Sequence, residues 1–404
     1  MLLRFAWRNL WRNGRRTAIT LGTVALATAV LIVAGALMRG MMVGALANAT
    51  NLGVGEVQAH GAGYLVDRSF YTTVRAPEAA LAAAGALGAG AAPRSYGFGL
   101  VAHQARSAGA LFWGVDPARE RTAFDLARHV WHGTFLGDEP AGGVVLGKKL
   151  AHTLGVEVGS ELVVVVQAAD GSLGNELFTV TGVLEAVGET NDRSAAIVHR
   201  DDFEALFVSG GRVHEIAVNG RGRVPLDVLQ ARIAAAVPDA DVRTWRELLP
   251  VLADMLALFD AAMWIFSGIF MVAAGLGVMN TMLMATFERI RELGVQKALG
   301  ATPLRVAGDV AAESVLLAVV GSVVGTAVGV ALSVWLGRHG IDTSRLGGDL
   351  SFGGVAFDPV WRAVLVPREL VGPIVGMWVA SVAAALYPAA LVARLDPVRA
   401  MQHV

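Results

Sequence analysis

Residues 288–306 read ERIRELGVQKALGATPLRV, and this stretch decides how the rest of the chain is interpreted. It is rich in charged residues and contains Gly294 and Gly300, yet it lies between two long apolar runs. A charge-free run of roughly 20 residues is long enough for a helix to cross a bilayer. The stretch therefore predicts a short, charged connection between two membrane spans.

The composition also indicates a membrane protein. Of the 404 residues, 54% are hydrophobic and 17% are charged, and the mean hydropathy is +0.55. Soluble domains usually contain about 25% charged residues. The formal net charge of −1 gives no basic field for nucleic acid, so no nucleic-acid partner is predicted. The chain has no cysteine, which excludes disulfides and thiolate metal sites.

Four charge-free segments are long enough to span a membrane, and each is bounded by charged residues. We therefore predict an α-helical membrane protein with four transmembrane helices. A large mixed α/β extracytoplasmic domain, the periplasmic core, separates the first two spans. The predicted segments are 1–16 (cytoplasmic interfacial helix), 17–38 (first span), 39–260 (extracytoplasmic domain), 261–287 (second span), 288–306 (cytoplasmic coupling loop), 307–337 (third span), 338–369 (extracytoplasmic loop), 370–393 (fourth span) and 394–404 (cytoplasmic tail).

The first segment has an alternative interpretation as a secretory signal peptide, with GALANAT at 44–50 as a cleavage site. Its apolar run is longer than a typical signal core, and three more spans follow, so a retained span is favoured. The preceding residues, 1–16, mix five arginines with Trp7 and Trp11, which is typical of an interfacial helix.

Basic residues in the short loops predict the orientation. The N-terminus, the 288–306 loop and the tail lie on one side in a four-span topology, and together they hold more arginine and lysine than the 338–369 loop. Both termini are therefore predicted to be cytoplasmic in the cell inner membrane, and residues 39–260 to lie outside.

The outer segment shows strand and helix patterns in alternation. Two β-rich runs flank ADGSLGN at 169–175, which predicts a hairpin with its turn at Asp170 and Gly171. Helical patterns occur in APEAALAAAGALGAG and PLDVLQARIAAAV. From Val242 to Asp260 a helical pattern leads into the second span, so we expect one continuous helix projecting from the membrane.

Two motifs suggest chemistry, but neither is convincing. GGVVLGKKL resembles a phosphate-binding loop, but Lys149 stands where that loop needs a Ser or Thr for Mg²⁺. His129 and His132 have a metal-like spacing without a nearby carboxylate. No catalytic residue, metal site or cofactor is therefore predicted in this chain.

The third span carries Gly321, Gly325 and Gly329 at intervals of four residues. Such a face lets another helix approach closely. Packing within the chain is the favoured role, and contact with a second copy or a paralogous subunit is the alternative.

Several segments resemble one family. NTMLMATFERIRELGVQKALGATPLRV (280–306) and LYPAALVARLDPVRAM (386–401) are similar to the FtsX-like permeases. VVLGKKLAHTLGVEVGSELVVVV (144–166) resembles the periplasmic core domain of the MacB type, and GEVQAHGAGY (55–64) is most similar to the lipoprotein-releasing LolC and LolE branch.

This resemblance implies a permease subunit of an ABC transporter that transmits motion rather than forming a channel. A separate cytoplasmic ATPase, in two copies, would bind ATP and Mg²⁺ and drive the outer domains. A second permease subunit, identical or paralogous, would complete the complex. Lipoprotein release from the inner membrane, with a periplasmic carrier and membrane lipid as further partners, is the function implied. The alternatives are an FtsX-like scaffold controlling an extracytoplasmic enzyme and MacB-like efflux of amphipathic cargo.

The 288–306 loop is then the predicted site of ATPase coupling. Its apolar and charged residues follow no single stripe, which suggests a helix held on several sides. Gly300 suits the end of that helix, and Thr302 and Pro303 suit the start of the next. A solvated connector is the alternative. The predicted coupling residues are Glu288, Arg291, Glu292, Lys297, Gly300, Thr302 and Pro303.

Overall fold

The structure is a computed structural model that describes residues 14–185, 187–343, 351–352, 355–394 and 396. The chain divides into two compact units. The membrane unit comprises Met1–Met42, Leu256–Asp342 and Val360–Val404, and the outer unit comprises Val43–Met255 and Thr343–Pro359. Most of the predicted interfacial helix (1–16) and of the predicted tail (394–404) lies outside the described residues.

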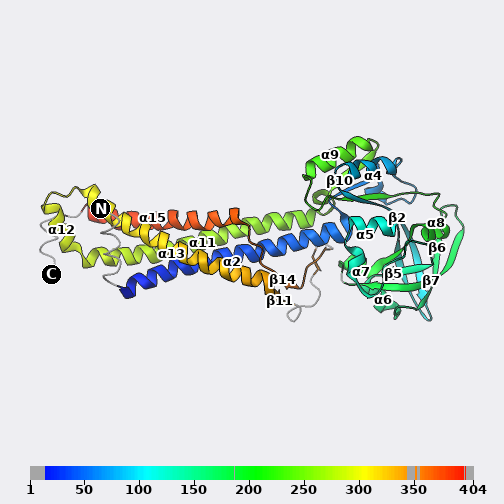
Figure 1. The fold of residues 1–404 in the computed structure, drawn as a ribbon, viewed down its shortest axis with the longest axis horizontal. Helices are drawn as coiled ribbons and strands as arrows, with labels where there is room; N and C mark the ends of the chain where they lie inside the picture. The colour runs from blue at the N-terminus through cyan, green and yellow to red at the C-terminus, as the bar shows by residue number, and fades with distance from the viewer. Residues whose placement is uncertain (1–13, 186, 344–350, 353–354, 395, 397–404) are drawn as a thin grey trace. The chain divides into compact units, whose positions relative to one another are not determined.

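The described part of the membrane unit contains four helices that are long and apolar enough to cross a membrane, as predicted. They run alongside one another in Figure 1. Side chains from all four meet in one apolar core, which includes Val24, Leu31, Val278, Leu317 and Met377. The helices are α2 (Gly14–Ala49), α11 (Pro250–Glu288), α13 (Pro303–His339) and α15 (Val371–Ala393), and the 3-10 turn η4 (Pro367–Leu370) precedes α15.

Three of these helices extend beyond the predicted spans. α2 continues past Arg39 to Ala49, α11 begins at Pro250 rather than at 261, and α13 extends beyond 307–337 at both ends. A helix satisfies its backbone hydrogen bonds internally and so has no need to end where the apolar run ends. Flanking charges therefore marked the limits of the apolar run and not those of the helix.

The prediction of a single helix from Val242 into the second span is wrong. Residues Ala240–Thr244 form strand β10, a short helix α10 covers Trp245–Leu248, and α11 starts only at Pro250. Thr244 and Glu247 form a capping box that starts α10. Pro250 disfavours a helical conformation at Leu249, so the chain breaks there before α11 begins.

The outer unit is built on a mixed sheet of ten strands, ordered β10-β1-β9-β2-β3-β8-β5-β7-β4, with β6 paired to β2 and β7. This confirms the predicted α/β domain. The strands are β1 (Val57–Gly61), β2 (Gly90–His103), β3 (Arg106–Val115), β4 (Val130–Gly133), β5 (Gly143–Leu146), β6 (Glu161–Gln167), β7 (Leu173–Leu184), β8 (Ala195–His199), β9 (Glu215–Asn219) and β10 (Ala240–Thr244).

Helices cover this sheet and create two main apolar cores. One core joins α4 and α9, the helices predicted from the two alanine-rich segments, to β1 and β9. The other joins α6 and α8 to β3 and β5–β8. The outer helices are the π-helical turn η2 (Thr50–Val54), α3 (Tyr64–Asp67), α4 (Pro77–Ala86), α5 (Pro117–Ala123), the 3-10 turn η3 (Leu126–His129), α6 (Lys148–Leu154), α7 (Glu189–Ser194), α8 (Arg200–Phe207) and α9 (Leu226–Ala236).

The predicted hairpin is present. β6 and β7 pair antiparallel, from Glu161 opposite Thr179 to Gln167 opposite Leu173. The connecting turn places Gly171 at φ +86°, a conformation that favours glycine, and the Asp170 carboxylate accepts a hydrogen bond from the Ser172 hydroxyl at 2.6 Å.

The segment before the fourth span contains, in its described part, two short strand pairs and the 3-10 turn η4. β11 (Ile341–Asp342) pairs with β14 (Val360–Trp361), and β12 (Ser351–Phe352) pairs with β13 (Val355–Ala356).

Candidate functional site

The 288–306 segment consists of a helix end, a short helix and a capped start to the next helix. α11 ends at Glu288, Arg289 interrupts the helical path, and α12 covers Ile290–Ala298. Gly300 follows at φ +96°, and the backbone N–H of Ala301 bonds back to the carbonyl of Gln296 at 3.0 Å. This closure is the glycine-terminated helix end that the sequence suggested.

α13 starts as predicted. The Thr302 hydroxyl accepts a hydrogen bond from the Arg305 backbone N–H at 3.3 Å, and Pro303 occupies the first helical turn. Threonine is a favoured N-cap, and the fixed φ of proline suits the first position. The connection between α12 and α13 is therefore short and capped on both sides.

One side of α12 packs against the membrane unit. Leu293 is buried with Val306 and Val310 of α13 and with Ala389 and Val392 of α15. Within the described residues, α12 is thus held on one side by the chain's own spans, and the docked partner that the sequence also suggested stays a prediction.

Three of the predicted charged coupling residues, Glu288, Glu292 and Lys297, have partners within the chain. The Glu288 carboxylate forms an ion pair with the guanidinium of Arg16 in α2, at 2.9 Å. The Lys297 amine donates to the carbonyls of Val392 and Ala393, at 3.4 and 3.0 Å, at the end of α15. A cation at a helix C-terminus interacts favourably with the unpaired carbonyls there.

The neighbouring Arg289, which the sequence analysis did not single out, also has an internal role. Its guanidinium donates to Glu313 of α13 at 2.9 Å and lies 3.5 Å from Glu292. Two ion pairs, Arg16–Glu288 and Arg289–Glu313, and the hydrogen bonds of Lys297 therefore fasten the ends of α11 and α12 to the rest of the membrane unit.

The other side of α12 is open. Arg291, Val295, Ala298 and Leu299 follow helical spacing along one stripe, which we call the α12 outer face, and all four are exposed. Val295 is 41% exposed and Leu299 is 83% exposed, while Leu304, at the start of α13, is 85% exposed. Arg291 makes no hydrogen bond or ion pair in the described part of the chain, so the face combines an unpaired cation with apolar groups.

The three glycines of the third span face α2. A Cβ at Gly321 would lie 2.7 Å from Val24, and one at Gly325 would lie 2.4 Å from the backbone oxygen of Ala25. At Gly329 the Cβ would lie 3.1 Å from Ala29. The glycine face therefore serves close packing inside the chain, and it is not left open to a second copy.

A groove of about 330 Å³ lies in the membrane unit between α2, α11 and the start of α15. Apolar side chains such as Leu31, Met263 and Trp264 line it. Asp260 and Arg368 join them, so the groove offers both an apolar wall and charged groups.

The outer unit contains a buried ionic cluster around Arg94 of β2, which was not predicted from the sequence. Arg94 is 1% exposed, and its guanidinium binds Glu120 of α5 through two hydrogen bonds of 2.6 and 3.1 Å. It also binds Glu215 of β9 at 3.1 Å and stacks over the rings of Trp113 and Phe124, at 5.7 and 4.4 Å from Cζ to centroid.

Burial alone lowers the pKa of the Arg94 guanidinium, but the nearby Glu120, Tyr96 and Glu215 outweigh it and hold the pKa well above the ordinary value. For Tyr96, burial and the charge of Glu215 raise the pKa of the phenol, so it remains neutral. The only sequence signal for this cluster was the presence of charged residues within apolar strand patterns.

Two histidines adjoin the cluster. The rings of His60 in β1 and of His214, just before β9, both stack on the Tyr64 ring, with centroids 5.2 and 5.6 Å from it. His60, Arg94 and Glu215 line a cavity of about 730 Å³. Three of the chain's four tyrosines, Tyr64, Tyr71 and Tyr96, line the same cavity.

The phosphate-loop-like motif GGVVLGKKL and the histidine pair make contacts within the outer unit. Lys148 lies over the ring of Trp131, at 5.5 Å, and Lys149 pairs with Glu189 at 3.3 Å. A Cβ at Gly147 would lie 2.4 Å from the Asn191 carbonyl, so α7 occupies the space over this turn. His129 bonds to the Asp125 carbonyl at 3.1 Å. Among the residues that the structure describes, no group of three or more potential ligands could hold a metal ion.

Two family models match the chain. The model of the MacB-like periplasmic core domain matches residues 17–236, and that of the FtsX-like permease C-terminal region matches residues 264–397. The first covers the first span and most of the outer unit. The second covers α12 and the last three spans.

The chain is also similar to individual proteins. The pyoverdine export ATP-binding/permease protein PvdT of Pseudomonas entomophila is 25% identical over 99% of this chain and 59% of its own length. The macrolide export ATP-binding/permease protein MacB of Nitrobacter winogradskyi is 29% identical over 49% of this chain and 32% of its own length. The chain thus spans less than two thirds of these relatives. The crystal structure of the periplasmic region of MacB from Actinobacillus actinomycetemcomitans aligns with 49% of this chain and 92% of its own, at 14% identity and a TM-score of 0.35.

Proposed function

Because the chain belongs to the family of FtsX-like permeases with a MacB-like periplasmic core domain, we propose that it is a transporter subunit that transmits motion to its outer unit. In this proposal a cytoplasmic ABC ATPase, a separate polypeptide in two copies, binds ATP and Mg²⁺. A second permease subunit, identical or paralogous, completes the complex. This chain supplies no cofactor-binding or catalytic residue.

The observation that carries the proposal is the α12 outer face. α12 is fastened to the membrane unit by Leu293, Lys297 and Arg289, while Arg291, Val295 and Leu299 remain exposed. A helix that transmits force needs a rigid attachment on one side and a contact surface on the other. In this proposal the attachment is provided by Glu288, Lys297, Gly300, Thr302 and Pro303. The surface for the ATPase is provided by Arg291 and its apolar neighbours.

For the cargo we propose an amphipathic molecule. The membrane-unit groove, with its apolar wall and its charged side chains at Asp260 and Arg368, suits a molecule of that class. Release of a lipoprotein from the inner membrane, with a periplasmic carrier, is one form of this function. MacB-like efflux is the second candidate, and the similarity to PvdT along 99% of the chain favours it. An FtsX-like scaffold that controls an outside enzyme is a third possibility with no specific support.

Reconstitution tests the proposal. The purified chain, placed in lipid vesicles, should hydrolyse no ATP until a cognate ATPase is added, and a lipopeptide or a macrolide should then move in an ATP-dependent way. ATP turnover by this chain alone, lost in Lys148→Ala, would contradict the proposal. Movement of the lipopeptide alone would support lipoprotein release, and movement of the macrolide alone would support MacB-like efflux.

The orientation has its own test, which the absence of cysteine makes simple. Single cysteines replace Asp170 in the outer hairpin and Arg291 on the α12 outer face. An impermeant thiol reagent should label only the cysteine at 170 in intact spheroplasts, because both termini and α12 are proposed to be cytoplasmic. Labelling at 291 but not at 170 would reverse the topology.

A further inference from the structure

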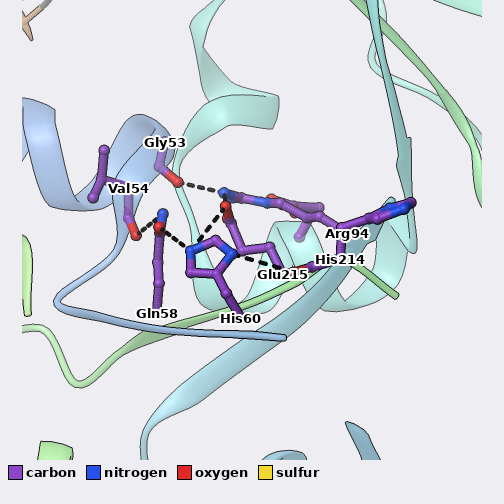
Figure 2. A network of polar contacts seen from close by, with 8 residues as sticks. Gly53, Val54, Gln58, His60, Arg94, His214 and Glu215 are labelled. Carbon is purple, nitrogen blue, oxygen red and sulfur yellow. Dashed lines mark hydrogen bonds and ion pairs between the residues drawn. The ribbon is translucent and has the colours of Figure 1, made fainter. Parts of the chain in front are cut away.

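The outer end of α2 is held by two side chains of the outer unit. α2 runs from the membrane unit into the outer unit and continues as the π-helical turn η2, which ends at Val54. Helix ends leave backbone carbonyls without internal partners. Arg94 donates to the carbonyl of Gly53, and the Gln58 amide donates to the carbonyl of Val54 at 2.8 Å, as Figure 2 shows.

These bonds fix the orientation of the Gln58 side chain. Its NH₂ group must face the Val54 carbonyl, because two oxygens would repel each other there. Its oxygen then faces Nε2 of His60 at 2.9 Å. Nε2 of His60 must therefore carry a proton.

The other ring nitrogen of His60 also faces an acceptor. Nδ1 lies 3.2 Å from the backbone carbonyl of His214 (Figure 2). Only the imidazolium form of histidine donates from both nitrogens. The contacts of His60, which is 1% exposed, are thus complete only when the ring carries both protons.

His214 provides the contrast. Its Nδ1 accepts a hydrogen bond from the backbone N–H of Tyr96 at 3.0 Å, and its Nε2 donates to the Phe70 carbonyl at 2.8 Å. One proton satisfies both contacts, so His214 is neutral. Burial lowers the pKa of His214, which agrees with that assignment.

Charged groups on several elements make the doubly protonated His60 acceptable. Glu215 of β9 lies 3.9 Å from Nε2 of His60 and also binds Arg94, whose second carboxylate partner is Glu120. With His60 protonated, two cations face two carboxylates. The remaining titratable neighbours are Tyr64 of α3, Tyr96 of β2, His214, and the more distant Arg68 and Arg212.

We propose that His60 is a proton-dependent lock that, through Gln58 and together with Arg94, holds the outer end of α2 to the sheet. The positioning residues of this lock are Gln58, His60 and Arg94. Its role in transmitting motion from α2 to the outer unit rests on the proposed function. Loss of the Nε2 proton of His60 places an unprotonated nitrogen against the Gln58 oxygen, which frees Gln58 and loosens the helix end, whereas loss of the Nδ1 proton removes only the bond to the His214 carbonyl. The 730 Å³ cavity along His60 and Glu215 gives protons a route from solvent.

The first test observes the protons directly. The full-length chain, with ¹⁵N-labelled histidine side chains, is placed in lipid nanodiscs. The ring resonances are followed between about pH 5 and pH 9, a range that extends to both sides of the ordinary histidine pKa of about 6.5. His60→Gln assigns the His60 signals by their loss. Both ring nitrogens of His60 should be protonated in the locked state, while His214 should show one protonated nitrogen. A singly protonated His60 across the whole range would overturn the proposal.

The second test observes the helix end. Nitroxide labels at Val43→Cys, on the outer part of α2, and at Val163→Cys, on exposed β6, report the distance between them. The distribution should be narrow when His60 is doubly protonated and should broaden as pH rises, in step with the His60 resonances. His60→Gln should broaden it at every pH, whereas His132→Gln, at an exposed site outside the cluster, should leave the wild-type behaviour unchanged.

A further variant separates the two halves of the lock. Gln58→Glu keeps an acceptor for His60 but removes the donor to Val54, so His60 should remain protonated while the distance distribution broadens. A distribution that stays narrow in Gln58→Glu and at all pH values would refute the lock, even if the ATPase-driven function were correct. If the lock is present and transport is absent, the proposed function is at fault instead.

Discussion

The ionic groups around Arg94 and those around α12 use the same residue types, but they differ in their access to water. Arg94 and Glu120 are 1% and 0% exposed, whereas Glu288 is 42% exposed and Arg16 is 18% exposed. Buried ions depend on each other because neither has water as an alternative partner. Ions at the surface lose little when a partner is removed.

This difference separates two tasks. The cluster around Arg94 can fix one geometry, because breaking it leaves uncompensated charge in the interior. Near α12 the Arg16–Glu288 pair is partly solvated and the α12 outer face is open, which in the proposed function would let this region bind and release the ATPase without unfolding. Four predictions test this contrast, in order of their expected effect on the free energy of unfolding of this chain.

The largest effect is expected for Arg94→Met. The substitution leaves Glu120 and Glu215 without their shared cation, and removal of one partner of a buried pair typically costs about 3–5 kcal/mol. Chemical denaturation of the purified chain, followed by tryptophan fluorescence, measures the loss. The control is Arg193→Met, whose exposed pair with Glu189 should contribute about 1 kcal/mol or less. Equal effects of the two substitutions would remove the contrast.

A smaller effect is expected for Gly325→Val in α13. Its Cβ would lie 2.4 Å from the Ala25 backbone oxygen, so α2 and α13 must separate. Overpacking of this kind costs about 1–3 kcal/mol. Gly308→Val, in the same helix but with no atom within 4 Å of its Cβ, carries the same change in helix propensity without the clash. Thermal unfolding in detergent should place Gly325→Val well below Gly308→Val.

The sequence predicted the elements that depend on local composition. The four spans, the hairpin turn at Gly171, the glycine closure of α12 and the cap at Thr302 all follow from residue types at short spacing. The break at Leu249 was missed because the apolar periodicity continues across it, although Pro250 was a visible signal.

The ionic cluster was beyond sequence reasoning of this kind. Arg94, Glu120 and Glu215 come from β2, α5 and β9, and only the order of strands in the sheet brings them together. Likewise, the sequence could not tell which charges near α12 turn inward. Glu288 and Lys297 do so because α2 and the end of α15 lie beside them, while Arg291 does not.

A pH-dependent effect is expected from His214. Its pKa is lowered from 6.5 in the folded chain, mainly by burial, so the unfolded chain binds more protons as the pH falls below 6.5. The free energy of unfolding should therefore decrease below that pH. Denaturation curves at a series of pH values measure the slope, and His214→Gln should flatten it.

Glu204 gives a separate signal at lower pH. Burial opposes the change, but hydrogen bonds from Ser209, Gly210 and Gly211 lower its pKa from 4.5, so its stabilisation is lost only below that value. A slope between pH 6.5 and 4.5 that is unchanged in His214→Gln would show that His214 is not its source.

The smallest effect on folding is expected for Arg291→Ala combined with Leu299→Ala on the α12 outer face. Both side chains are exposed, and surface substitutions of this kind usually change stability by about 0.5 kcal/mol or less. The same substitutions should weaken ATPase binding strongly, because loss of a charged partner at a desolvated interface costs about 2–5 kcal/mol. That corresponds to a drop in affinity of about 30-fold or more.

Glu288 is unsuitable for this experiment, because it pairs with Arg16 and its substitution would also weaken the attachment of α11 within the chain. The matched control is Arg338→Ala with Leu332→Ala, also exposed but at the other end of α13. Co-purification with the ATPase and coupled ATP turnover are the measurements. Wild-type binding and turnover in the Arg291/Leu299 variant would show that the open face of α12 is only a solvated connector, and the contrast between a fixed cluster and an available surface would no longer hold.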